Sequence, residues 1–107
     1  MRMFPAKDTG EALVYTLNFA GTNTDLVAGE TLTAVVSVTI SRVSGVVDAG
    51  MASMLSGTAQ ISGNTVTQLV INGITGNRYG LTARCTTSAG RTVAEGGIIT
   101  ITPAYLQ

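Results

Sequence analysis

The chain has 107 residues, of which 45% are hydrophobic and only 11% charged, and its six Lys and Arg balance six Asp and Glu. This length fits one domain with a real core and leaves no room for a second. A net charge of zero provides no field to attract nucleic acid or an anionic membrane, so we expect neither as a partner.

The residue types that carry most protein chemistry are scarce. The chain has no His and a single cysteine, Cys85, so no disulfide within the chain and no cysteine metal cluster can form. A Ser or Thr nucleophile would depend on Lys7, the only lysine, which we place in a mobile N-terminal tail. The acidic residues are scattered and show neither a carboxylate dyad nor a calcium loop. We expect no enzyme, no cofactor and no metal.

The low charge also bears on association. A net charge near zero gives a free monomer little protection, which favours a protein packed against others, including copies of itself. The alternative is a Thr-rich β-domain that is poor in charge and still monomeric. No apolar run reaches the length of a signal peptide or a transmembrane span, so we expect a soluble product made in a cytoplasm.

The first half of the chain shows a period of two, which predicts half-buried strands. Residues 13–19 place four apolar side chains on one face: Leu13, Tyr15, Leu17 and Phe19. Residues 32–40 repeat the pattern, with Val35 as the exception, and the proposed inner face holds Leu32, Ala34, Val36, Val38 and Ile40. A polar connection, 21–29, joins the two strands, and Gly29 supplies backbone freedom before the second.

The stretch 43–64 is cut by four glycines and fits either two short strands or one strand and a loop. A short helix over 48–55, capped by Asp48, is less favourable because Gly50 would lie inside it. Residues 65–72 predict another strand, with Leu69 and Ile71 inward. A corner over 72–77 then carries the chain to the opposite sheet.

The last third predicts a hairpin. One strand presents Tyr79, Leu81, Ala83, Cys85 and Thr87 on a single face. A turn at 88–90 leads to the last strand, 93–102, where Gly96 and Gly97 suggest a bulge. A two-residue loop would set Arg84 opposite Glu95, whereas a three-residue loop with Gly90 left-handed would shift that register by one.

These elements predict an all-β, immunoglobulin- or fibronectin-like antiparallel β-sandwich of six or seven strands, with an extended N-terminal tail over 1–11 and a single domain over 12–107. Tyr79, following a turn at the start of the penultimate strand, resembles the tyrosine corner of such sandwiches, whose phenol fixes the chain just upstream. The Trp and paired cysteines of antibody domains are absent.

Six residues are candidate contact residues. We expect the tail to dock on a neighbouring protein through residues 1–7, which include Lys7. Phe4 offers an apolar anchor for this contact, and Pro5 restricts the conformation of the tail. The alternative is that the tail is disordered. Arginine is favoured at interfaces, so we add Arg78, Arg84 and Arg91, which the hairpin brings near one another. The alternative for these arginines is salt bridging across strands on a solvent face.

Three segments carry a resemblance to a known family. The string 2–15, RMFPAKDTGEALVY, together with Gly29-Glu30-Thr31-Leu32 and the run 87–92, TSAGRT, is similar to the small immunoglobulin-like phage proteins called fiber-tail adaptors. The sequence departs from that pattern at Thr9, at Asn18-Phe19, where the family tends to have Asp-Trp, in a second strand without Trp, and in a longer central stretch 43–64.

The resemblance implies a non-enzymatic structural protein of the virion, assembled in the bacterial cytoplasm, that links tail and fibre components through protein contacts. Its partners would be other virion proteins. A capsid decoration or neck protein is one alternative. A loop-based module that binds a receptor or carbohydrate is another, which the lack of Trp disfavours.

Overall fold

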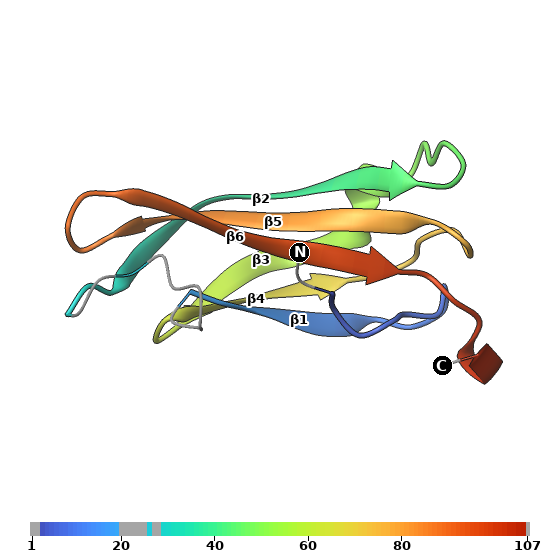
Figure 1. Cartoon of the computed structure of the whole chain (residues 1–107), viewed down its shortest axis with the longest axis horizontal. Helices are drawn as coiled ribbons and strands as arrows, with labels where there is room; N and C mark the ends of the chain where they lie inside the picture. Colours follow the sequence, from blue (N-terminus) through green and yellow to red (C-terminus); the bar gives the residue numbers. More distant parts are fainter. Residues whose placement is uncertain (1–2, 20–25, 27–28, 107) are drawn as a thin grey trace.

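The computed structural model describes residues 3–19, 26 and 29–106. It contains six strands and two short 3-10 turns, in two antiparallel sheets of three strands that pack face to face (Figure 1). One sheet has the order β1-β4-β3, and its strands span Leu13–Asn18, Thr65–Val70 and Leu55–Ser62. The other has the order β2-β5-β6, and its strands span Leu32–Ser44, Arg78–Thr87 and Thr92–Thr100. The all-β sandwich predicted from the sequence is confirmed.

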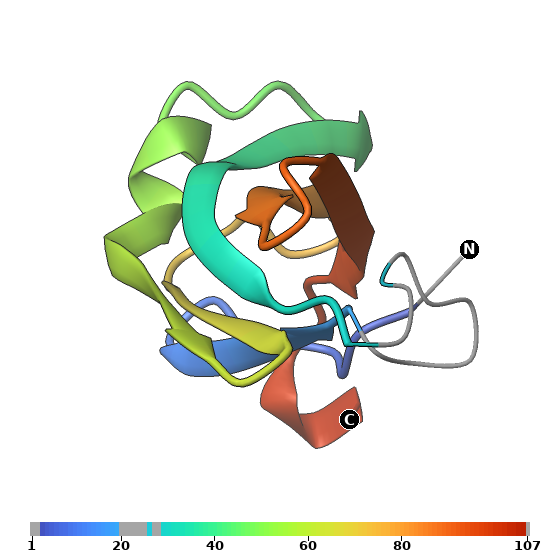
Figure 2. The same cartoon turned by 90° about the vertical axis from the view of Figure 1, so that its left-hand side faces the viewer.

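The core lies between the two sheets, which form the upper and lower layers when the sandwich is seen end-on (Figure 2). On β1 the predicted inner face is confirmed, since Tyr15 and Leu17 are buried and Phe19 follows them. On β5 every second side chain is buried, as the sequence predicted: Tyr79, Leu81, Ala83, Cys85 and Thr87. The corner over 72–77 does carry the chain from β4 to the opposite sheet.

Strand β2 does not keep a regular alternation of inward and outward side chains. Its register with β5 shifts between Leu32 and Ala34 and again between Val35 and Ser37. Each shift inserts a residue and turns the following side chains to the other face. Val35 therefore packs against the core while Val36 is 58% exposed, the reverse of the prediction from strict alternation.

Strand β4 also has the opposite phase from the one predicted. Val66, Gln68 and Val70 are buried, while Leu69 and Ile71 are only half-buried. Gln68 can face inward because its amide donates to the carbonyl oxygens of Ser56 and Leu69, at 3.1 and 2.9 Å. A hydrogen-bonded polar side chain is tolerated in a core, so the more apolar phase of a strand is not always the inner one.

The stretch 43–64 contains one strand and a loop, the second of the two predicted arrangements. β2 continues to Ser44, a loop follows, and the 3-10 turn η1, Met51–Met54, leads directly into β3. Asp48 accepts a hydrogen bond from the Gly50 amide at 2.9 Å, which closes a turn rather than capping a helix.

The β5–β6 hairpin has the three-residue loop. Gly90 adopts φ +78°, and Ala83 rather than Arg84 lies opposite Glu95. The ladder runs without a shift through Gly96 and Gly97, so the predicted bulge is wrong. The presence of glycine at position 96 has a steric explanation instead, because a Cβ there would lie 2.6 Å from the Leu81 carbonyl oxygen.

This close approach predicts that Gly96→Ala destabilises the domain by about 1–3 kcal/mol, because backbone atoms of β5 must move to admit the methyl group. Gly80→Ala is the matched control on β5, where a Cβ would meet only ordinary contacts at 3.5 Å. Urea unfolding of both variants checks this, and equal midpoints for the two would contradict it.

Candidate assembly surfaces

The N-terminal segment, residues 3–7, lies along the outer edge of β6. Met3 and Lys7 form parallel bridges with Ile98 and Ile101. The Phe4 amide donates to the Ile98 carbonyl at 2.8 Å, and the Thr102 amide donates to the Lys7 carbonyl at 2.8 Å. The segment covers a sheet edge that would otherwise present unpaired backbone groups.

Aromatic side chains connect this segment to β1. The Phe4 and Tyr15 rings lie 5.2 Å apart at an angle of 59°, and the Tyr15 hydroxyl donates to the Pro5 carbonyl at 3.0 Å. Phe4 is half-buried and Pro5 exposed, and together with Leu13 and Val14 they line a hollow of about 420 Å³. Burial, followed by the charge of Glu11, raises the pKa of Tyr15 to about 12.

Lys7 is fully buried, contrary to the expectation of a mobile position. Its Nζ donates to the carbonyl oxygens of Asn72 and Asp8, at 2.7 and 2.8 Å. Burial lowers the pKa of Lys7, while the nearby charges of Glu11 and Asp8 act in the opposite direction. The lysine thus fixes the segment to the corner after β4, and its ammonium does not face solvent.

The three candidate arginines do not form one group. Arg78 begins β5, Arg84 lies in its middle, and Arg91 follows the hairpin loop, so the first and last are separated by about 30 Å of extended strand. All three are exposed. Arg78 and Arg91 therefore belong to opposite ends of the sandwich.

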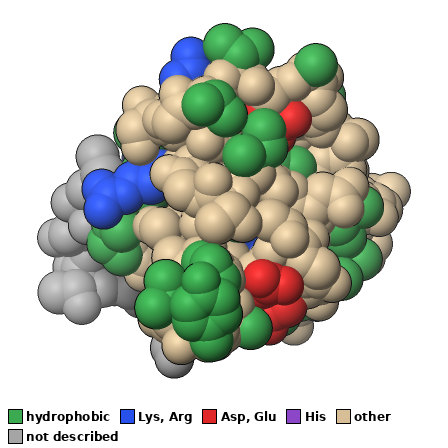
Figure 3. Space-filling view, turned by 90° about the vertical axis from the view of Figure 1, so that its right-hand side faces the viewer, with side chains coloured by type: hydrophobic (Ala, Val, Ile, Leu, Met, Phe, Trp, Pro, Cys, Tyr) green, Lys and Arg blue, Asp and Glu red, His purple; other side chains and the backbone are tan. Residues whose placement is uncertain are grey.

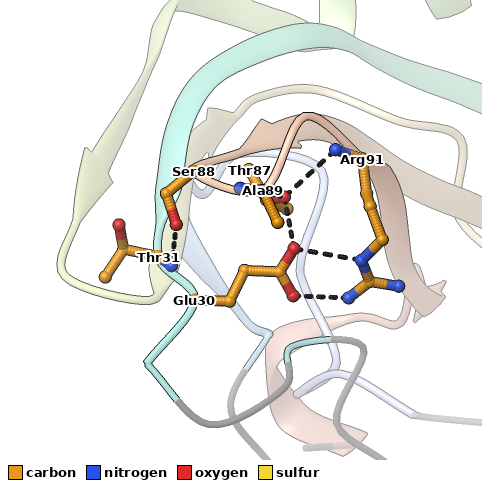
Figure 4. A network of polar contacts seen from close by, with 6 residues as sticks. All are labelled: Glu30, Thr31, Thr87, Ser88, Ala89 and Arg91. Carbon is orange, nitrogen blue, oxygen red and sulfur yellow. Dashed lines mark hydrogen bonds and ion pairs between the residues drawn. The ribbon is translucent and has the colours of Figure 1, made fainter.

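At the end that carries the hairpin loop, Glu30 organises a polar cluster (Figure 4). The Glu30 side chain is buried, and its carboxylate accepts from Arg91 Nη2 at 2.5 Å and from Arg91 Nε at 3.0 Å. The Thr87 hydroxyl also donates to this carboxylate. A bidentate guanidinium contact gives such an ion pair a fixed geometry.

The same cluster holds the turn itself. The Thr87 hydroxyl oxygen accepts from the amides of Ala89 and Arg91, each at 3.3 Å, and the Ser88 hydroxyl accepts from the Thr31 amide at 3.0 Å (Figure 4). The two short motifs noted in the sequence, 29–32 and 87–92, are thus one spatial unit, in which the residues before β2 are tied to the β5–β6 loop.

At the opposite end, the Tyr79 hydroxyl joins three segments. It accepts from the Ile74 amide and from Asn77 Nδ2, each at 3.1 Å, and it donates to Asp48 Oδ2 at 2.8 Å. The predicted tyrosine corner is therefore confirmed, with an added contact to the loop after β2. Burial is the main cause that raises the pKa of Tyr79, so the phenol keeps its proton.

Asn77 extends this network to the loop tip. Its amide donates to the Val46 carbonyl at 2.8 Å and accepts from the Val46 amide at 2.9 Å. Gly45 has φ +103°, and a Cβ there would lie 2.0 Å from Asn77 Oδ1. Only glycine fits this approach, so the corner determines the path of the loop.

Large exposed apolar side chains concentrate at this same end. The three most exposed among the described residues are Tyr105, Val47 and Leu106, at 84, 80 and 67%. The loop after β2 and the final 3-10 turn η2, Ala104–Leu106, both lie at the right of Figure 1. Figure 3 faces this end and shows an upper and a lower apolar group, the lower one beside acidic side chains.

Metal-ligating and thiol side chains were also located among the described residues. Within ranges 3–19, 26 and 29–106, no group of three His, Cys, Asp or Glu side chains could hold a metal ion. Burial raises the pKa of the Cys85 thiol, which keeps it protonated and unreactive. Neither short helical turn in this part of the chain has the length or apolar character that a membrane crossing requires.

These observations define a small, elongated structural domain of the antiparallel β-sandwich class, with its two ends fixed by separate polar networks. The family of podophage GP4 fiber-tail adaptor proteins, gp77, matches residues 7–100. The chain belongs to this family and has a structural adaptor role in a phage virion, with other virion proteins as its partners. No curated protein and no solved structure matches the chain.

Sequence reasoning missed two features. In the sequence, Glu30 is one of several loop carboxylates, and only its place in the 29–32 motif indicates a special role. Val46 and Val47 were assigned to an irregular stretch, and their exposure depends on contacts with Asn77, which is 31 residues away.

The Glu30 cluster predicts that Arg91→Met lowers the free energy of unfolding by about 1–3 kcal/mol, because a buried carboxylate loses its bidentate partner. Arg84→Met is the control, an exposed position on the same hairpin whose change should remain within about 0.5 kcal/mol. Thermal and urea unfolding measure both. Equal stability of the two variants would show that the pair does not hold this end.

The buried Tyr15 phenol predicts a loss of stability in alkali. Its folded-state pKa of about 12 exceeds the usual value of 10, so the stabilisation is intact below pH 10 and disappears as the pH rises toward 12. When the pH rises from 9 to 11, this group should lower the free energy of unfolding of the wild type by about 1 kcal/mol. The Tyr15→Phe variant lacks the phenol and should not show this extra loss. Urea unfolding at both pH values tests this, and parallel losses in the two proteins would refute it.

Proposed function

We propose that the chain joins tail and fibre components of the virion through protein–protein contacts, without catalysis, after assembly in the host cytoplasm. An adaptor needs two separate contact surfaces. The observation that carries the proposal is the shape: the domain measures 43 × 24 × 20 Å, and each end of its long axis has its own fixed set of loops.

The candidate contact residues divide between these surfaces. Arg78 belongs to the corner end and Arg91 to the hairpin end, and Arg84 lies exposed between them. Phe4 and Pro5 contribute the hollow beside β1. Lys7 enters the proposal only as the internal anchor of their segment. We further propose that the chain divides into an N-terminal segment, 1–11, and a domain, 12–107. We also propose that the chain associates with copies of itself, which its near-zero net charge permits.

Purified phage particles provide the test. Tail-containing and tail-free fractions are separated, and the chain is quantified in each by mass spectrometry. We expect a small, fixed copy number that follows the tail fraction, and loss of fibres from particles made without the chain. Hundreds of copies on tail-free heads would contradict the adaptor and indicate a capsid decoration protein. Specific binding of the isolated protein on a glycan array would instead favour a carbohydrate-binding module.

A further inference from the structure

The loop after β2 presents apolar side chains that the fold does not use. Val46 and Val47 are 61 and 80% exposed, and Val43, near the end of β2, is also exposed. None of the three belongs to the hydrophobic core or to the side chains packed against it. Exposed apolar groups gathered in this way are typical of protein contact sites.

The backbone under these side chains is held in place. Asn77 binds both backbone polar groups of Val46, and the Arg42 guanidinium donates to the Gly45 carbonyl at 2.9 Å. Asp48, two residues further on, is held by the Tyr79 hydroxyl. A loop that is ordered before binding loses little conformational entropy when it docks, which favours affinity.

Two of the three charged side chains around the valines are positive. Arg42 and Arg78 are exposed, and Arg78 lies opposite Ser44 in the β2–β5 ladder, next to the loop. The nearby carboxylate of Asp48 is half-buried, with one oxygen bonded to the Gly50 amide and the other to the Tyr79 hydroxyl. The surface here is therefore apolar at its centre, and the exposed charges at its border, those of Arg42 and Arg78, are positive.

We propose that this loop tip, residues 43–47, is an anchor that inserts into an apolar pocket bordered by Asp or Glu side chains on another virion protein. Complementary charge on the partner would pair with Arg42 and Arg78, and the pocket would cover Val46 and Val47. This inference rests on the proposed adaptor function and assigns one of its two contact surfaces.

The test uses particles made without this chain, to which purified full-length protein is added, with bound copies per particle measured by mass spectrometry. The double variant Val46→Ser with Val47→Ser should bind about tenfold more weakly or worse, because two apolar side chains lose their burial in the partner. Val36→Ser is the matched control, an exposed valine on β2 away from the tip, and should bind as the wild type does. Melting temperatures establish that all three are folded.

The charged border is tested in the same assay. Arg78→Glu should weaken binding, and the gap to wild type should shrink at high salt, whereas Ala94→Glu, at an exposed position of β6 away from the tip, should leave binding unchanged. Wild-type binding by both the valine and the Arg78 variants would overturn the anchor and leave the adaptor function intact. Failure of the wild type to bind any tail-bearing particle would overturn both.

Discussion

The hydroxyl of Tyr79 is the interaction on which the rest of this structure depends. Its ring is among the largest fully buried groups, and its oxygen connects the corner between the sheets, through Ile74 and Asn77, to the loop after β2, through Asp48. A buried hydroxyl without partners would be costly, so the three segments must keep their places together. The corner thus sets both the crossing between sheets and the path of the exposed loop.

The two ends of the sandwich use different chemistry for a similar purpose. At the hairpin end, an ion pair and a threonine hydroxyl fix the loop to the start of β2. At the corner end, hydrogen bonds among the described residues, without an ion pair between side chains, fix the loop after β2. The N-terminal segment covers the edge of β6 between them. A chain with few charges can hold its loops in place because many polar side chains at these points bind backbone groups, which adds order without adding net charge.

Much of this fold follows from local pattern. The inner faces of β1 and β5, the corner and the left-handed Gly90 were predictable because alternation and turn chemistry act over a few residues. The phases of β2 and β4 were not, since the register shift between Leu32 and Ala34 turns Val35 inward and a hydrogen-bonded Gln68 takes an apolar place. The buried Lys7 depends on the Asn72 carbonyl, 65 residues away, and the contact surfaces depend on similar long-range placement.

Cryo-electron microscopy of intact particles can decide whether the domain joins two virion proteins, because it shows what each end of the domain touches. We expect one copy of the sandwich between two different virion proteins, with the Val46–Val47 loop buried against one of them and the Glu30 end directed toward the other. A domain seated on the capsid shell, or one attached by a strand edge with both ends in solvent, would contradict it.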